Sequence, residues 1–365
     1  MPDLIRIEGL IRAAIAQKVA PAIAFSVSQA DEAPLLWFSG AHRPPPDAGL
    51  CDHHTRFDLA SLTKPLTTTL WALQLVSAGR LDLDAPLGDA LPLADAALAH
   101  APVWRLLNHT AGLPAHRPYF RGLGAGPMQR GTFDAARAAL RRMLAATECA
   151  SPPGAEEVYS DLGYLLLEWL CETRDRALAE RWKDLPGHGP DSLHFRALSA
   201  ATATADARYA ATEACPWRRR MLQGEVHDEN CWVMGGIGGH AGLFGTLPAV
   251  HHLARRWLQT IRGEDAGLGL RLDLAMAATD RKWMHPRGTR VLGWDTPTPG
   301  RSSAGRHFGR NAIGHLGFTG TSIWLDPDAD VVMVLLTNRV CPSRENQGIR
   351  ALRPTLHDAG WACFT

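Results

Sequence analysis

The chain has 365 residues, of which 46% are hydrophobic and 21% are charged, and its formal net charge is +1. These are ordinary values for a globular protein, and they predict two lobes or one large domain with a sizeable core. A nearly neutral chain with only short arginine runs gives no sign of a nucleic-acid partner or of an anionic membrane surface.

The cysteines and the N-terminus indicate a compartment. Seven cysteines occur without any C-x-x-C pair, and the odd number argues against both a disulfide framework and a zinc knuckle. Reduced thiols are typical of a cytoplasmic protein. The N-terminal stretch "MPDLIRIEGLIRAAIAQ" interrupts its apolar residues with charges, so it lacks the continuous apolar region of a signal peptide. No segment approaches the roughly 18 apolar residues of a membrane span. We therefore expect a cytoplasmic protein with no membrane association.

The predicted elements begin with this N-terminal helix and a hairpin of two short strands, "AIAFSVSQA" and "PLLWFSG". A helix that starts near Ser61 and stops at Gly79 comes next. The region from Leu81 to Arg281 has a mostly helical pattern, with helices over Thr132–Thr147, Ser160–Cys171 and Leu247–Ile261. Two more strands follow in "GHLGFTGTSIWLDP" and "DVVMVLLTN", joined by a turn over Asp326–Asp330, and the last helix covers Glu345–Ala359 with a kink at Pro354.

Strands at both ends and helices in the middle favour an α+β fold, in which one antiparallel sheet from both chain ends is flanked by helices and carries a mostly helical insertion. Residues 1–80 with 282–365 would form the sheet domain, and residues 81–281 the helical domain. We expect the active site between the two.

The first chemical signal is "SLTK". Ser61 and Lys64 are three residues apart, so on a helix their side chains are neighbours on one face. Pro65 is tolerated only in a first helical turn, which places Ser61 at the helix N-terminus, where the helix dipole favours developing negative charge. A serine hydroxyl needs an adjacent base, and Lys64 can serve if burial lowers its pKa. Alone, the pattern also fits a helix-capping serine and a surface lysine.

Two further signals lie downstream. Tyr159, Ser160 and Asp161 open an apolar helix, where the serine or the aspartate is also an ordinary cap. His315 lies on a predicted strand next to Gly317, a strand glycine that would let a substrate backbone approach closely.

In this order the three signals resemble the signature of serine β-lactamases and penicillin-binding DD-peptidases: S-x-x-K, then Y-S-[DN], then a basic residue, any residue and glycine. The sequence is similar to the class C-like branch of that family, which also includes esterases. "LLNHTAGLP" at 106–114 and "GGHAGLFGTLPAVHHLARRW" at 238–257 also look like family segments. The resemblance covers nearly the whole chain and implies a β-lactamase/transpeptidase-like fold.

The resemblance also implies roles. Ser61 would be the nucleophile that forms an acyl-enzyme, and Lys64 would take or hold its proton. Tyr159 would relay a proton to the leaving group and then activate water, and His315 would take the place of the lysine of K-T-G. The backbone N–H groups of Ser61 and Phe318 would form the oxyanion hole. Whether Lys64 or Tyr159 is the acylation base stays open.

Two positions depart from the family pattern. Asp161 replaces the more usual asparagine, so an acceptor stands where a donor often binds the substrate amide or the lysine. Leu316 replaces the threonine or serine of K-T-G and cannot hold a substrate carboxylate, which puts penicillins and D-Ala-D-Ala peptides in doubt as substrates.

Other polar residues receive a plainer interpretation. His227, Asp228, Glu229 and His240 match no standard metal-site spacing, and we expect a loop held by hydrogen bonds there. We expect His109 to fix a turn and not to act as a base.

The expected function is therefore a serine hydrolase that acts by acyl transfer on a small ester, amide or peptide, with no metal and no organic cofactor. A true β-lactamase or DD-carboxypeptidase is the alternative among enzymes, and a non-catalytic ligand sensor on the same fold is the alternative outside them. The sequence gives neither the physiological substrate nor the oligomeric state. We expect specificity to lie in the loops around Pro118–Met128 and Asp184–Ala205.

Overall fold

The computed structural model of the chain describes residues 2–44, 49–123, 133–189, 192–198 and 206–364. Its helices are α1 (Pro2–Ala16), α2 (Leu70–Ser77), α3 (Ala96–His100), α4 (Trp104–Leu107), α5 (Phe133–Ala145), α6 (Asp161–Arg174), α7 (Leu178–Arg181), α8 (Glu229–Val233), α9 (Leu247–Ile261), α10 (Leu272–Ala278) and α11 (Ile349–Trp361). Its strands are β1 (Ala22–Gln29), β2 (Leu35–Gly40), β3 (Phe57–Asp58), β4 (His194–Phe195), β5 (Ala214–Cys215), β6 (Arg220–Met221), β7 (Leu243–Gly245), β8 (Ile313–Leu316), β9 (Ser322–Asp326) and β10 (Val331–Thr337).

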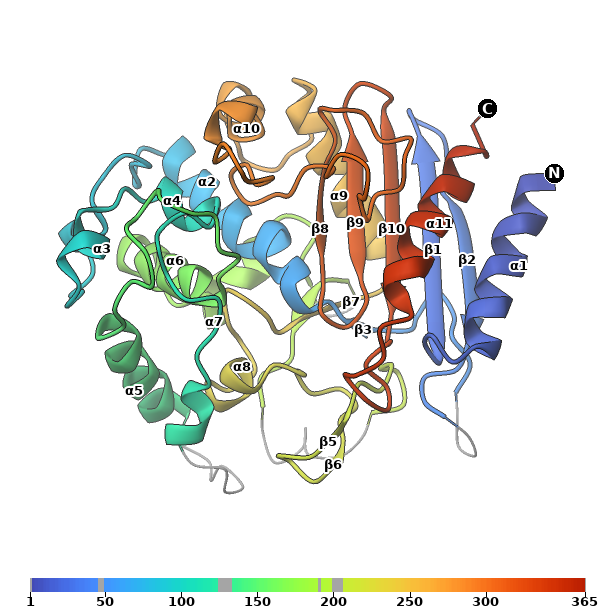
Figure 1. The fold of residues 1–365 in the computed structure, drawn as a ribbon, viewed down its shortest axis with the longest axis horizontal. Coiled ribbons are helices and arrows are strands. Elements are labelled where there is room, and N and C mark those ends of the chain that lie inside the picture. Colours follow the sequence, from blue (N-terminus) through green and yellow to red (C-terminus); the bar gives the residue numbers. More distant parts are fainter. Residues whose placement is uncertain (1, 45–48, 124–132, 190–191, 199–205, 365) are drawn as a thin grey trace.

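The main sheet joins the two ends of the chain. Five antiparallel strands lie in the order β2-β1-β10-β9-β8, so N-terminal β1 pairs with C-terminal β10. Figure 1 shows the blue and red strands side by side in one half of the molecule and most helices in the other half. The predicted α+β sheet from both chain ends is confirmed.

Both faces of this sheet are buried. Successive side chains of a strand point to opposite faces, so alternate residues of one strand belong to different cores. On β10, Val332, Val334 and Leu336 belong to a core shared with the helices of the middle region. Val331, Met333 and Leu335 belong to a second core. Helices α1 and α11 cover that second face, while α9 packs on the first (Figure 1).

Some predicted elements need correction. The stretch "GHLGFTGTSIWLDP" holds two strands, β8 and β9, because the chain turns back at Gly317–Thr321, where the amide of Gly317 donates to the Thr321 carbonyl (2.8 Å). The last helix begins at Ile349 and not at Glu345, although Pro354 does lie inside it. Parts of the predicted helix over Thr132–Thr147 and of the loops Pro118–Met128 and Asp184–Ala205 lie outside the described residues.

The division into residues 1–80 with 282–365 and residues 81–281 stays a proposal. Two helices pack across its boundaries: α9 covers the sheet, and α2 packs on α6.

None of the seven cysteines forms a disulfide within the part of the chain that the structure describes. Within the described ranges, none of the helices has the length and apolar character needed to cross a bilayer.

Several buried histidines should make stability depend on pH. Burial lowers the pKa values of His188, His251 and His357 to about 4. The unfolded chain then binds more protons between about pH 6.5 and 4, so stability is lost as pH falls through this window. We expect the free energy of unfolding to fall by about 2 kcal/mol for each such histidine when the pH is lowered from 7.5 to 5.

The measurement is the free energy of unfolding at pH 7.5 and 5 for the wild type and for His251→Gln. The side chain of His251 lies between the hydroxyls of Ser26 and Ser28 (2.7 and 2.8 Å). His251→Gln should lower stability at pH 7.5 but reduce the loss on acidification by about 2 kcal/mol. The exposed neighbour His252, changed to Gln, is the control and should leave the loss unchanged. An equal loss in wild type and His251→Gln would contradict the prediction.

Candidate active site

Ser61 stands at the start of a continuous helical run. One 3₁₀ turn (Ala60–Leu62) leads through a π-helical stretch (Lys64–Thr69) into α2. Ala60 has a positive φ of 48°, which costs an alanine about 1–2 kcal/mol. Buried Asp58 holds this bend, because its Oδ1 accepts the amide of Ala60 at 2.8 Å. The sequence therefore placed Ser61 correctly at a helix start but gave no sign of the π-helical geometry that follows.

Lys64 lies directly beneath Ser61, fully buried. Its ammonium donates three hydrogen bonds, to Ser61 Oγ (3.0 Å), Asp161 Oδ1 (2.7 Å) and the carbonyl of His240 (3.1 Å). Burial by itself lowers the pKa of Lys64, but the charge of Asp161, with a further contribution from Tyr159, outweighs burial and raises the pKa above its usual range. The expectation of a lowered pKa was wrong, because it left out the carboxylate.

Asp161 is the first residue of α6, whose N-cap Ser160 accepts the amide of Gly163 (3.4 Å). Burial raises the pKa of Asp161, but the Lys64 ammonium and the nearby His116 hold it well below its usual range. Asp161 and Lys64 therefore form an ion pair at the floor of the site, and the aspartate that replaces the family's asparagine keeps the lysine charged.

Tyr159 presents a buried hydroxyl that has no hydrogen-bond partner among the described residues. The ammonium of Lys64 lies 4.9 Å from the centre of its ring, and the His109 ring packs 4.6 Å away. His109 Nδ1 accepts the amide of Ser160 at 3.0 Å. His109 thus fixes the turn that aims Tyr159, as the sequence predicted, and the Tyr159 oxygen is free to bind a reacting group.

His315 lies on β8, with its ring 6.0 Å from that of Tyr159. Its Nδ1 is 3.0 Å from the carbonyl of Leu316. A carbonyl only accepts, so Nδ1 carries the proton and Nε2 is left as an acceptor. Burial, followed by the charges of Lys64 and Arg290, lowers the pKa of His315 to about 3. His315 is therefore neutral at physiological pH.

The β8–β9 turn completes the site. No hydrogen bond joins the amide of Ser61 or that of Phe318 to a described residue, so both N–H groups are available to an oxyanion. The turn has its own need for glycine: a Cβ on Gly317 would lie 2.0 Å from Thr321 Oγ1 and 2.7 Å from the Leu59 carbonyl. Substrate approach is therefore not required to explain Gly317.

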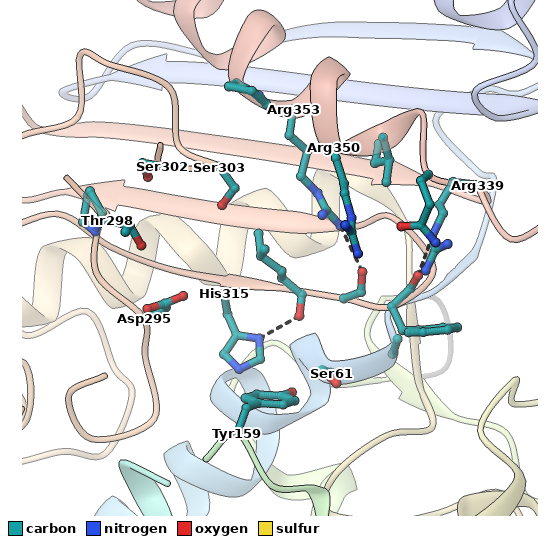
Figure 2. Close-up of a pocket in the computed structure, with 18 of the residues that line it drawn as sticks. Ser61, Tyr159, Asp295, Thr298, Ser302, Ser303, His315, Arg339, Arg350 and Arg353 are labelled. Atoms are coloured by element: carbon teal, nitrogen blue, oxygen red, sulfur yellow. Dashed lines mark hydrogen bonds between the residues drawn. The ribbon is translucent and has the colours of Figure 1, made fainter. Parts of the chain in front are cut away.

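One cavity of about 1300 Å³ brings the predicted residues together. Its lining includes Ser61, Tyr159, Asp161, His315, Leu316, Gly317 and Phe318. Figure 2 shows Ser61, Tyr159 and His315 grouped in one part of the cavity, with Arg350 and Arg353 of α11 and Thr298, Ser302 and Ser303 beyond them. A hydroxyl beside a fixed cation, an unpartnered phenol and two free amides can carry out acyl transfer.

Sequence reasoning missed several lining residues. His116 Nδ1 lies 3.6 Å from Asp161 Oδ2, and Arg290 and Asp295 come from the loop before β8. His116 lies two residues after the end of the "LLNHTAGLP" segment, but nothing in the local sequence singles out Arg290 or Asp295.

The histidines and carboxylates considered for a metal are hydrogen-bonded to protein groups. His240 Nε2 meets Asp228 Oδ1 at 2.8 Å, and His227 Nε2 meets Glu213 Oε2 at 3.1 Å. Glu229 accepts from Arg344 at 2.6 Å. This agrees with the expected loop held by hydrogen bonds.

Because His315 is neutral, its replacement should change the rate but not the pH dependence of the rate. We expect His315→Asn to lower kcat/KM for a neutral ester about tenfold, because one hydrogen-bond acceptor is lost or displaced. The shape of the pH–rate profile should not change between pH 5 and 9, since the histidine does not titrate there. The test compares both profiles. A step near pH 6.5 that disappears in His315→Asn would contradict the prediction.

Comparison with known proteins places these features in a wider context. A family model described as "Beta-lactamase" matches residues 7–355. A curated relative from Salmonella agona (strain SL483), named "Putative D-alanyl-D-alanine carboxypeptidase", is 27% identical over 319 residues, which cover 80% of this chain and 71% of the relative.

Solved structures show the same fold. The hydrolase EstCE1, described as having promiscuous acyltransferase activity, superposes with a TM-score of 0.74 at 20% identity over 98% of both chains. The octameric penicillin-binding protein homologue from Pyrococcus abyssi superposes with a TM-score of 0.70 at 18% identity, over 97% of this chain and 77% of that one.

Proposed function

The chain belongs to the β-lactamase family, and from this premise we propose that it is a serine hydrolase in which Ser61 forms an acyl-enzyme from an ester or amide. The observation that carries the proposal is the contact between the Lys64 ammonium and Ser61 Oγ at 3.0 Å, beside the unpartnered hydroxyl of Tyr159. The nucleophile and a proton acceptor thus line one cavity, with a fixed cation buried directly beneath the nucleophile.

The charges favour Tyr159 over Lys64 as the base. A lysine whose pKa is raised by Asp161 keeps its proton and cannot take another from Ser61. It can hold Ser61 Oγ in place and stabilise negative charge on it and on the phenolate of Tyr159. The hydroxyl proton of Ser61 then passes to Tyr159.

The reaction proceeds in two steps. Ser61 Oγ attacks the carbonyl carbon, the carbonyl oxygen takes the negative charge against the amides of Ser61 and Phe318, and Tyr159 returns the proton to the leaving alcohol or amine. Water then loses a proton to Tyr159 and attacks the acyl carbon. As the bond to Ser61 Oγ breaks, Tyr159 returns that proton to Oγ, so the acid is released and Ser61 and Tyr159 are restored. One water is consumed for each ester or amide bond broken.

The size of the cavity supports an extended substrate. Its volume of about 1300 Å³ is larger than a small acyl group needs, and it continues from Ser61 towards α11 and the loop at 297–303. We propose a small-molecule ester, amide or short peptide with groups on both sides of the scissile bond. A true β-lactamase or DD-carboxypeptidase is the second candidate, favoured by the name of the Salmonella relative.

The test measures hydrolysis of a neutral activated ester and acylation by a penicillin with the same protein. Turnover of the ester with slow or no penicillin acylation supports the proposal. Rapid stoichiometric penicillin acylation promotes the second candidate. If the protein catalyses neither reaction, a non-catalytic ligand sensor becomes the better interpretation.

Leu316 should be the main barrier to penicillins. Its side chain is half-buried, packs against the second core of the main sheet and lines the cavity, where it offers no hydroxyl. A hydrogen bond to a charged group is worth about 1.5–3 kcal/mol. We therefore expect Leu316→Thr to raise the rate of penicillin acylation roughly ten- to hundredfold, with little change for neutral esters.

Leu316→Val is the matched control, because valine has nearly the shape of threonine without the hydroxyl. Equal penicillin rates for Leu316→Thr and Leu316→Val would contradict the proposed role of the hydroxyl. Rapid acylation of the wild type would mean that another group binds the carboxylate. Thr319 and Thr321 are poor candidates, since they are buried and donate to backbone carbonyls, but Arg350 and Arg353 line the cavity.

A further inference from the structure

Arg290 lies beside Tyr159 in the same cavity, and the three sequence motifs do not include it. Its guanidinium carbon is 5.0 Å from the centre of the Tyr159 ring, nearly the same distance as the Lys64 ammonium at 4.9 Å. The two histidines that also face this ring are neutral, because burial and nearby positive charge lower the pKa values of both His109 and His315. Within the described part of the chain, Arg290 and Lys64 are the cations that lie against the ring of Tyr159.

The fold holds Arg290 rigidly in this place. Its Nη1 donates to Glu157 Oε1 at 2.7 Å, and its own amide and that of Thr289 donate to Glu157 Oε2 at 3.0 and 3.1 Å. Glu157 is buried, with 6% of its side chain exposed. Gly288 makes room for the carboxylate, because a Cβ there would lie 2.1 Å from Glu157 Oε2. Since Glu157 is two residues before Tyr159, one short segment anchors the arginine and carries the phenol.

The positive charge of Arg290 reaches the site despite its acidic neighbours. Asp295 Oδ2 is 3.9 Å from Arg290 Nη2. Even so, burial and the positive charges of Arg290 and Lys64 lower the pKa values of both His109 and His315. The titratable and charged groups around Tyr159 are Lys64, His109, His116, Glu157, Asp161, Tyr164, Arg290, Asp295 and His315.

We infer that Arg290 is a positioning residue for acyl transfer: its guanidinium, fixed by Glu157, lies against the ring of Tyr159 and stabilises the negative charge of the phenolate that accepts the proton of Ser61. This inference rests on the proposed function. It gives the site a second cation where neutral His315 supplies none.

The test is the pH profile of kcat/KM for a neutral activated ester. Arg290→Gln keeps a hydrogen-bonding side chain but removes the charge. We expect the midpoint of the acidic limb to move up by about one pH unit and the rate at pH 7 to fall about tenfold, with KM nearly unchanged. Arg290→Lys keeps the charge but gives up the paired guanidinium contacts with Glu157, so its midpoint should stay near that of the wild type. Structural damage alone would not spare the variant that keeps the charge.

Two further variants sharpen the test. The double variant Arg290→Gln/His315→Lys places a cation at position 315, which also faces Tyr159. The midpoint of its acidic limb should therefore lie between those of Arg290→Gln and the wild type. Arg287→Gln is the matched control, because Arg287 is exposed in the same loop, lies outside the cavity, and its side chain donates to the Ala155 carbonyl (3.4 Å). Its profile should equal that of the wild type.

The outcomes separate this inference from the proposed function. If the wild type turns over the ester and Arg290→Gln keeps the wild-type midpoint, Arg290 only anchors its loop and the inference is wrong. If the wild type forms no acyl-enzyme, the proposed function itself fails. Should Arg290→Gln not fold, Arg290→Met decides, because methionine fills similar space without a charge: an upward shift of the midpoint supports the inference, and a wild-type midpoint overturns it.

Discussion

Ser61→Ala should lose ester hydrolysis almost completely, with kcat at least about 10⁴-fold lower than that of the wild type. Losses on this scale follow removal of the nucleophile, because the remaining groups have no attacking atom to activate. The fold should persist. Among the described residues, Ser61 Oγ accepts one hydrogen bond, from Lys64 Nζ, and Asp58 holds the bend at Ala60.

The measurement combines steady-state hydrolysis of a neutral activated ester with thermal unfolding. Ser343→Ala is the control, since Ser343 is exposed, lies outside the cavity, and its hydroxyl accepts the amide of Glu345 (3.3 Å). It should keep full activity. If Ser61→Ala retained more than a few per cent of wild-type turnover, another residue would be the nucleophile.

Lys64→Met should have the second largest effect, a fall in the acylation rate of at least about 10³-fold. Methionine fills much of the same space but supplies no charge to Ser61 Oγ or to the phenolate of Tyr159. The variant should also lose about 3 kcal/mol of stability, because Asp161 would keep a poorly solvated charge without its partner.

A second substitution separates the two effects of Lys64→Met. Adding Asp161→Asn removes the unpaired charge, so the double variant should recover much of the stability but none of the activity. Acylation is followed by stopped-flow release of the leaving group, and stability by denaturant unfolding. Turnover by Lys64→Met within tenfold of the wild type would remove the lysine from the mechanism.

The parts of the site that depend on short spacing could be predicted from the sequence. Ser61 and Lys64 meet because three residues on a helical run bring them onto one face. The sheet from both chain ends followed from the alternating apolar residues near each terminus, and α9 was predicted at its observed bounds, Leu247–Ile261. Short-range periodicity carries this information because the residues that interact are close to one another along the chain.

The predictions that failed, and the residues that were missed, depend on contacts between segments that are distant in the sequence. The sign of the pKa change of Lys64 is decided by Asp161, 97 residues away. The position of Arg290 is decided by Glu157, 133 residues away. The same limit applies to Gly317, since the atoms that exclude a Cβ there include the Leu59 carbonyl, which is remote in sequence.

The most direct test of acyl transfer at Ser61 is intact-mass analysis of the wild type, quenched in acid within the first turnovers of a neutral activated ester, followed by peptide mapping. We predict one added acyl group per chain, located on the peptide that contains Ser61. A wild type that hydrolyses the ester with no adduct, or with the acyl group on a cysteine, on Tyr159 or on any peptide without Ser61, would contradict the mechanism.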